Sequence, residues 1–130
     1  KTALDVLSAH PDLAGFLAFG SQGPIGAGRA VEERKLIGKV QVIGPFSPGQ
    51  GRKLVKEGAI SGGFMWNPME AGKVFVTMGK MLADGTPVTD GMEIPGLGVV
   101  HPDAASKNII TENLVPINAD TVDKLADMGL

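Results

Sequence analysis

A glycine-rich stretch at residues 20–28 (GSQGPIGAG) is the segment whose composition most suggests a binding site. It follows an apolar run and precedes a helical pattern, which is where free backbone N–H groups and the helix dipole bind nucleotide phosphates. The dinucleotide fingerprint G-x-G-x-x-G, started at Gly26, reaches Gly28 and then Val31, so the third glycine is absent. The chain also has no G-x-x-x-x-G-K-S/T loop. We therefore expect a turn that lets a helix pack closely on a sheet, not a nucleotide site.

The side chains that could perform acid–base or metal chemistry are scattered along the chain. His10 and His101 each precede a proline in a predicted turn, and neither has a second histidine three or four residues away. Glu32 and Glu33 lie at the exposed end of a predicted helix, where a solvated face is the better interpretation. No serine, cysteine or carboxylate cluster completes a nucleophilic triad. We expect no catalytic residue, no metal site and no cofactor, and hence no enzyme.

Composition excludes two further classes of protein. The 130 residues carry 12 Lys and Arg against 14 Asp and Glu, a net charge of −2, so there is no basic footprint for nucleic acid. No apolar run approaches the roughly 18 residues that a membrane-spanning helix needs. There is no cysteine, which is compatible with either the cytosol or the periplasm. Lys1 opens directly into a helical pattern, so we expect any secretion signal to have been removed.

The elements that would position a site alternate between strand and helix. Periodicity, proline and glycine positions predict helices at residues 2–10, 23–36, 48–57, 68–83 and 120–128. Extended segments are predicted at residues 13–19, 39–44, 59–66, 92–94, 99–101 and 109–117, the first of them a buried strand. In the helix at 68–83 we expect the apolar residues to pack in a core. This order is typical of an α/β fold with a parallel sheet and helices on its faces.

The carboxyl ends of the first three strands form the predicted ligand site, because ligands of open α/β sheets bind there. The candidate residues at these ends are Phe19, Gly20, Ser21, Gln22, Phe46, Trp66 and Asn67. Aromatic faces pack on the C–H side of a sugar ring, while amides and hydroxyls bind its OH groups. The sequence pattern leaves open whether Phe46 and Trp66 contact such a ligand or only cap the sheet.

The ordered set of segments resembles a known family over essentially the whole chain. Residues 4–19 (a helix, then HPDL, then an apolar strand) and Ile25-Gly26-Ala27 are similar to type I periplasmic sugar-binding proteins of ABC transporters. Three further segments resemble the branch that binds autoinducer-2 and rhamnose: Trp66-Asn67-Pro68, EIPGLG at 93–98 and the tail at 118–130. The resemblance implies a three-layer, Rossmann-like α/β fold, of which this chain would be a part.

The site positions depart from the family's usual residues. Gly20-Ser21 stands where common sugar binders have Asn-Asp, Phe46 where they have Asp, and Trp66 where they have Gln. The turn after the first strand also lacks the Pro-x-Ala of autoinducer-2 binders. The resemblance therefore implies a small sugar-like or polyol ligand in a pocket more apolar than usual, and it names no particular sugar.

The resemblance also implies how the chain is divided and what it works with. Residues 1–66 would be the C-terminal part of the second of two lobes, and 67–130 would hold a hinge crossing, a helix returning to the first lobe and the tail. A missing N-terminal portion of the same protein would complete the two lobes around the ligand. The protein would be periplasmic and would deliver its ligand to a membrane ABC permease. The alternative is the effector-binding domain of a sugar-responsive transcription regulator of the lactose-repressor family, which has the same fold.

Overall fold

The computed structural model describes residues 1–111 and 113–130 and divides into two compact units. Unit 1 comprises Lys1–Met65 and Val115–Leu130, and unit 2 comprises Trp66–Leu114. Their boundary after residue 65 lies beside the predicted one after residue 66. Residues 115–130, which the predicted division groups with 67–114, belong to unit 1. The correspondence between these units and the lobes implied by the resemblance stays a prediction.

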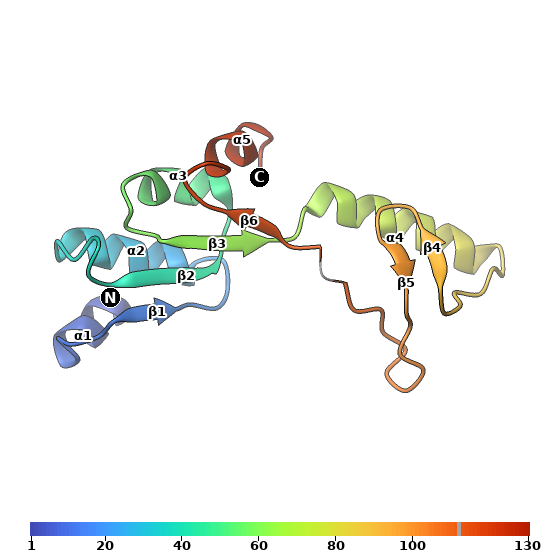
Figure 1. Cartoon of the computed structure of the whole chain (residues 1–130), viewed down its shortest axis with the longest axis horizontal. Coiled ribbons are helices and arrows are strands. Elements are labelled where there is room, and N and C mark those ends of the chain that lie inside the picture. Colours follow the sequence, from blue (N-terminus) through green and yellow to red (C-terminus); the bar gives the residue numbers. More distant parts are fainter. Residues whose placement is uncertain (112) are drawn as a thin grey trace. The chain divides into compact units, whose positions relative to one another are not determined.

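Unit 1 is built on a four-stranded sheet in the order β1-β2-β3-β6 (Figure 1). Its elements are α1 (Thr2–Ala9), β1 (Gly15–Leu17), α2 (Gly23–Glu33), β2 (Gln41–Pro45), α3 (Pro48–Lys56), β3 (Gly62–Met65), β6 (Val115–Ile117) and α5 (Val122–Asp127). The first three strands are parallel, whereas β6 pairs antiparallel with β3, Phe64 opposite Pro116. The α/β class is therefore confirmed, but the sheet is mixed, because the chain leaves β3 to form unit 2 and then returns along β6 in the opposite direction.

The core of unit 1 lies between the sheet and a row of helices in which α1 contacts α2, α2 contacts α3 and α3 contacts α5. Along β2, Val42 is fully buried while its neighbour Ile43, on the opposite face, is 44% exposed. Successive strand residues point to opposite faces, so the helices cover the Val42 face. Gly28 on α2 allows this packing, since a Cβ atom there would come within 2.7 Å of Ile60.

Charged residues join α3 to α5 at the surface of unit 1. Arg52 bonds to Asp123 at 2.7 Å and to Asp127 at 2.9 Å, and Lys56 bonds to the second oxygen of Asp123 at 2.8 Å. The bonds to Lys56 and Arg52 lower the pKa of the Asp123 carboxyl below its ordinary value. Val122 and Leu125 of α5 are buried beneath these ion pairs. The C-terminal helix is therefore fixed to α3 by both apolar and ionic contacts.

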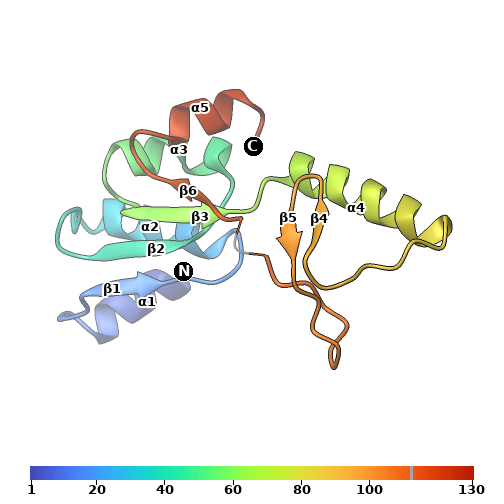
Figure 2. The ribbon, with the colours of Figure 1, turned by 45° about the vertical axis from the view of Figure 1, so that its right-hand side comes forward.

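Unit 2 consists of α4 (Pro68–Ala83) and a hairpin of β4 (Met92–Ile94) and β5 (Gly98–Val100), as Figure 2 shows. The predicted bounds of α4 and β4 are confirmed. The hairpin turn rests on α4, where a Cβ atom on Gly96 would lie 3.0 Å from Val74. Val74, Ile94 and Val100 are buried. The core of this unit is accordingly small.

Two elements whose apolar composition predicts burial have exposed apolar side chains in this chain. The predicted buried strand at 13–19 is an edge strand of three residues, and Leu17 and Phe19 are 68% and 81% exposed. Among the described residues β1 pairs with β2 alone, so one edge of this strand has no neighbouring strand. On α4 only Val74 is buried, whereas Phe75 and Leu82 are exposed, because the short hairpin covers one side of this helix.

Candidate functional site

A tight turn follows β1 and carries four of the predicted site residues. Phe19, Gly20, Ser21 and Gln22 are all exposed. Gly20 has φ +74°, a left-handed conformation that glycine adopts without strain, and its carbonyl accepts the Gly23 N–H at 3.1 Å. The turn therefore delivers the chain from the strand directly into α2. It presents one hydroxyl, one amide and an aromatic ring to solvent, as a site for a neutral hydroxylated ligand requires.

The end of β2 differs from the sequence expectation, because Phe46 is part of the core. Its side chain is 3% exposed, so its ring offers no face to a ligand in this structure. The ring fills the space beside two glycines, Gly51 on α3 and Gly63 on β3, where a Cβ atom would overlap it. We assign Phe46 the role of supporting the neighbouring turns and not that of contacting the ligand.

The two residues that follow β3 begin unit 2. Trp66 is 60% exposed, so its ring is available to a ligand. Asn67 is half-buried and caps α4: its Oδ1 accepts the backbone N–H of Met69 at 3.0 Å. An asparagine at this position satisfies one of the free N–H groups of the first turn, and Pro68 after it is the expected first helical residue. Asn67 thus has a structural role apart from any ligand.

Tertiary structure brings Gln50, a residue outside the predicted site, beside Gln22. The Nε2 of Gln22 donates to the Oε1 of Gln50 at 3.0 Å, joining the start of α2 to the first turn of α3. Both side chains are exposed. No sequence signal pairs residues 28 positions apart. The sequence indicates only that helices which follow neighbouring parallel strands begin at the same edge of the sheet, which brings their first turns near one another.

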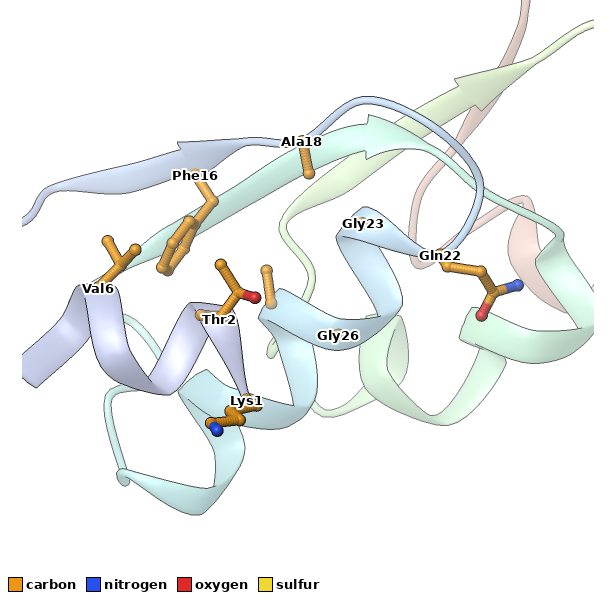
Figure 3. A pocket seen from close by; sticks show the side chains of 10 residues that line it. Lys1, Thr2, Val6, Phe16, Ala18, Gln22, Gly23 and Gly26 are labelled. Carbon is orange, nitrogen blue, oxygen red and sulfur yellow. The ribbon is translucent and has the colours of Figure 1, made fainter.

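A cavity of about 420 Å³ lies among α1, β1 and α2 (Figure 3). Its lining is mostly apolar and small, with Val6, Phe16 and Ala18 on its walls. The Gln22 amide is turned away from Phe16 and Val6, toward α3 (Figure 3). Apart from Gln22, Lys1 and Thr2 are the polar residues that line it. This cavity therefore lacks the converging polar groups of a sugar site.

The groups needed for catalysis are not brought together within residues 1–111 and 113–130. His101 pairs with Asp90 at 2.7 Å on the surface of unit 2, and neither histidine hydrogen-bonds to a hydroxyl in these ranges. The same residues contain no group of three or more His, Cys, Asp or Glu able to hold a metal ion. In the described part of the chain, no helix has the length and apolar character required to cross a membrane.

The chain is similar in sequence and in fold to known proteins. Residues 1–87 match the family model of the periplasmic binding protein domain. A sugar ABC transporter structure from Actinomyces odontolyticus aligns with a TM-score of 0.78 at 28% identity. That alignment covers 95% of this chain and 40% of the other.

Two more distant structures share the fold. LsrB from Clostridium saccharobutylicum, in complex with AI-2, aligns with a TM-score of 0.74 at 20% identity, covering 94% of this chain and 42% of LsrB. An ABC transporter solute binding protein from Clostridium phytofermentas, with bound L-rhamnose, aligns at 0.76 and 17% identity, covering 98% and 44%. This chain therefore spans less than half the length of each of these proteins.

Proposed function

Because the chain belongs to the periplasmic binding protein family, we propose that it is part of the solute-binding component of an ABC importer and binds a sugar-like or polyol molecule. The observation that carries this proposal is the exposed turn at the carboxyl end of β1. Phe19 offers an apolar face there, and Ser21 and Gln22 offer neutral hydrogen-bonding groups. A neutral hydroxylated molecule needs this combination, while a phosphate or carboxylate ligand would call for cationic partners.

The proposed ligand-binding set is Phe19, Gly20, Ser21, Gln22, Trp66 and Asn67. Phe46 is left out of direct contact because its ring is buried. Within unit 1, the exposed Phe19 ring and the neutral side chains of Ser21 and Gln22 support a ligand bound without charged hooks. The similarity to a sugar ABC transporter at 28% identity supports the same ligand class.

The partners follow from the same proposal. The protein works in the periplasm, closes on its ligand together with the remainder of the two-lobed protein and presents the closed form to a membrane permease. It binds its ligand and releases it chemically unchanged, so it is not an enzyme. NMR spectra of the bound sugar, recorded over hours with purified protein, should show no new product, and hydrolysis or isomerisation would contradict this part of the proposal.

A thermal-shift screen of the full-length protein tests the function directly. The panel holds monosaccharides and polyols, beginning with L-rhamnose and D-fucose, together with sugar phosphates as charged comparators. A ligand that binds only the native state stabilises it by about 2.7 kcal/mol at one hundred times its Kd. We expect a neutral sugar or polyol to raise Tm and the phosphates to have no effect. A response confined to the phosphates, or to no compound, would overturn the proposal.

A further inference from the structure

From the geometry of the Gln22–Gln50 pair we infer that Gln50 is a further ligand-binding residue, which together with Gln22 recognises two neighbouring hydroxyls of the ligand. The inference rests on the proposed function and extends it to a residue outside the turn after β1. Both glutamines lie at the carboxyl end of the sheet, since α2 and α3 begin directly after β1 and β2. Their side chains meet at 3.0 Å and are both exposed.

The pairing leaves a complementary set of polar atoms open to solvent. A glutamine amide has an oxygen that accepts and an NH2 group that donates two hydrogen bonds. The pair uses the Gln22 Nε2 and the Gln50 Oε1. Among the described residues, neither the Gln22 Oε1 nor the Gln50 Nε2 has a hydrogen-bond partner. One acceptor and one donor are therefore held side by side, and each sugar hydroxyl both donates and accepts.

The backbone that carries each glutamine is hydrogen-bonded within its helix, so both side chains start from fixed points. The Gln22 carbonyl accepts the Gly26 N–H at 2.9 Å in the first turn of α2, and the Gln50 N–H donates to the Ser47 carbonyl at 3.0 Å. Gly51, next to Gln50, lies directly on the buried ring of Phe46. Phe46 thus acts as a positioning residue, because it supports the turn that carries Gln50.

A purely structural role explains the pair less well. A hydrogen bond between two exposed amides replaces bonds to water and adds little to stability. The helices α2 and α3 are already joined by buried residues, among them Ile25 and Leu54. An exposed amide pair at the ligand edge of the sheet is better explained by binding.

The test measures, by calorimetry, the affinity of the full-length protein for the neutral sugar or polyol that gives the largest shift in the thermal screen. The variants are Gln50→Ala, Gln50→Glu and Gln22→Ala/Gln50→Ala. The matched control is Gln41→Ala, an exposed glutamine at the start of β2 and hence at the opposite edge of the sheet. Far-UV circular dichroism and the Tm without ligand show that each variant is folded.

We expect Gln50→Ala to weaken binding about three- to tenfold, as for one neutral hydrogen bond. Gln50→Glu should weaken it as well, because a carboxylate cannot donate, and it keeps the shape of the side chain should the alanine variant misfold. Gln41→Ala should bind like the wild type. The difference in affinity between the ligand and its derivative that lacks one hydroxyl should also be smaller for both Gln50 variants than for the wild type.

Two contrary outcomes are separable. If the sugar binds and both Gln50 variants match Gln41→Ala in affinity, the inference is overturned while the proposed function stands, and a lowered Tm would then assign the pair a structural role. If no sugar or polyol binds the wild type, the proposed function fails and the inference fails with it.

Discussion

Phe46 and Gly63 are matched in shape: the edge of the phenylalanine ring occupies the space where a side chain on Gly63 would begin. A Cβ atom on Gly63 would also overlap the backbone oxygen of Gly44 on the neighbouring strand. Because Gly44 and Gly63 are paired in the sheet, the Gly44 oxygen cannot move away without disturbing the pairing of β2 with β3. The same ring also lies against Gly51, so it packs against both β3 and α3.

Gly63→Ala should therefore destabilise the protein by about 1–3 kcal/mol, the usual cost of overpacking a core. Gly62→Ala is the matched control, since a Cβ atom there lies 3.4 Å from the Ile117 oxygen, an ordinary contact. We expect the control to cost less than about 1 kcal/mol. Urea unfolding followed by circular dichroism measures the stability of both variants. If Gly63→Ala is as stable as Gly62→Ala, the Phe46 ring and the strand backbone move aside for the added methyl group.

Asp123→Asn should change how stability depends on pH. Its bonds to Lys56 and Arg52 lower the pKa of the folded-state carboxyl below the ordinary value of 3.8. The ionic contribution is therefore fully present above that pH and is lost as pH falls through the folded-state pKa.

Urea midpoints measured from neutral pH down to about pH 2.5 should show the variant less stable than wild type at neutral pH, with the difference narrowing below about pH 4. Asp12→Asn is the control, because Asp12 makes no ion pair among the described residues. A constant difference between Asp123→Asn and wild type across this range would contradict the linkage. High salt should also narrow the difference in stability between wild type and Asp123→Asn, since Arg52, Lys56 and Asp123 are largely exposed and salt screens their charges.

Trp66→Ala in the full-length protein should weaken ligand binding by about 2–4 kcal/mol, typical of removing an aromatic anchor. The ring is 60% exposed without ligand and has a large apolar face for a sugar. Calorimetry measures the loss, with Leu82→Ala in the last turn of α4 as the control. Trp66 is the only tryptophan of this chain, so binding should also alter its fluorescence, assigned by comparison with Trp66→Phe. If a folded Trp66→Ala variant binds the ligand as tightly as the wild type, the ring does not contribute to binding.

Asn67 substitutions can separate capping from binding. Asn67→Ala should lower stability by about 1 kcal/mol, because the Met69 N–H loses its acceptor, and it should also weaken binding. Asn67→Ser keeps a capping oxygen but lacks the amide, so it should restore stability while binding stays weak. Chemical unfolding and calorimetry on the same two variants give both quantities. Full recovery of affinity in Asn67→Ser would show that the ligand does not use the amide.

Much of the local structure could be predicted from local chemistry. The helix at 68–83 has a capping asparagine, a proline at its start and Gly85 after its end, and its predicted bounds agree with α4. The predicted helix at 48–57 agrees with α3 to within one residue, because Pro48 marks its start. Strand lengths were overestimated, as in β1, because apolar composition does not report where hydrogen-bonded pairing with a neighbour ends.

The α/β class, the order of the elements and the turn that begins at Gly20 can be predicted from the sequence, since each depends on residues close together in the chain. Three features depend on tertiary packing: the antiparallel direction of β6 beside β3, the burial of Phe46 beside Gly51 and Gly63, and the contact of Gln22 with Gln50. Each of these depends on which segments pack together across many residues. Packing selects partners by shape and by the free space that glycine leaves, and neither is visible in a pattern of neighbouring residue types.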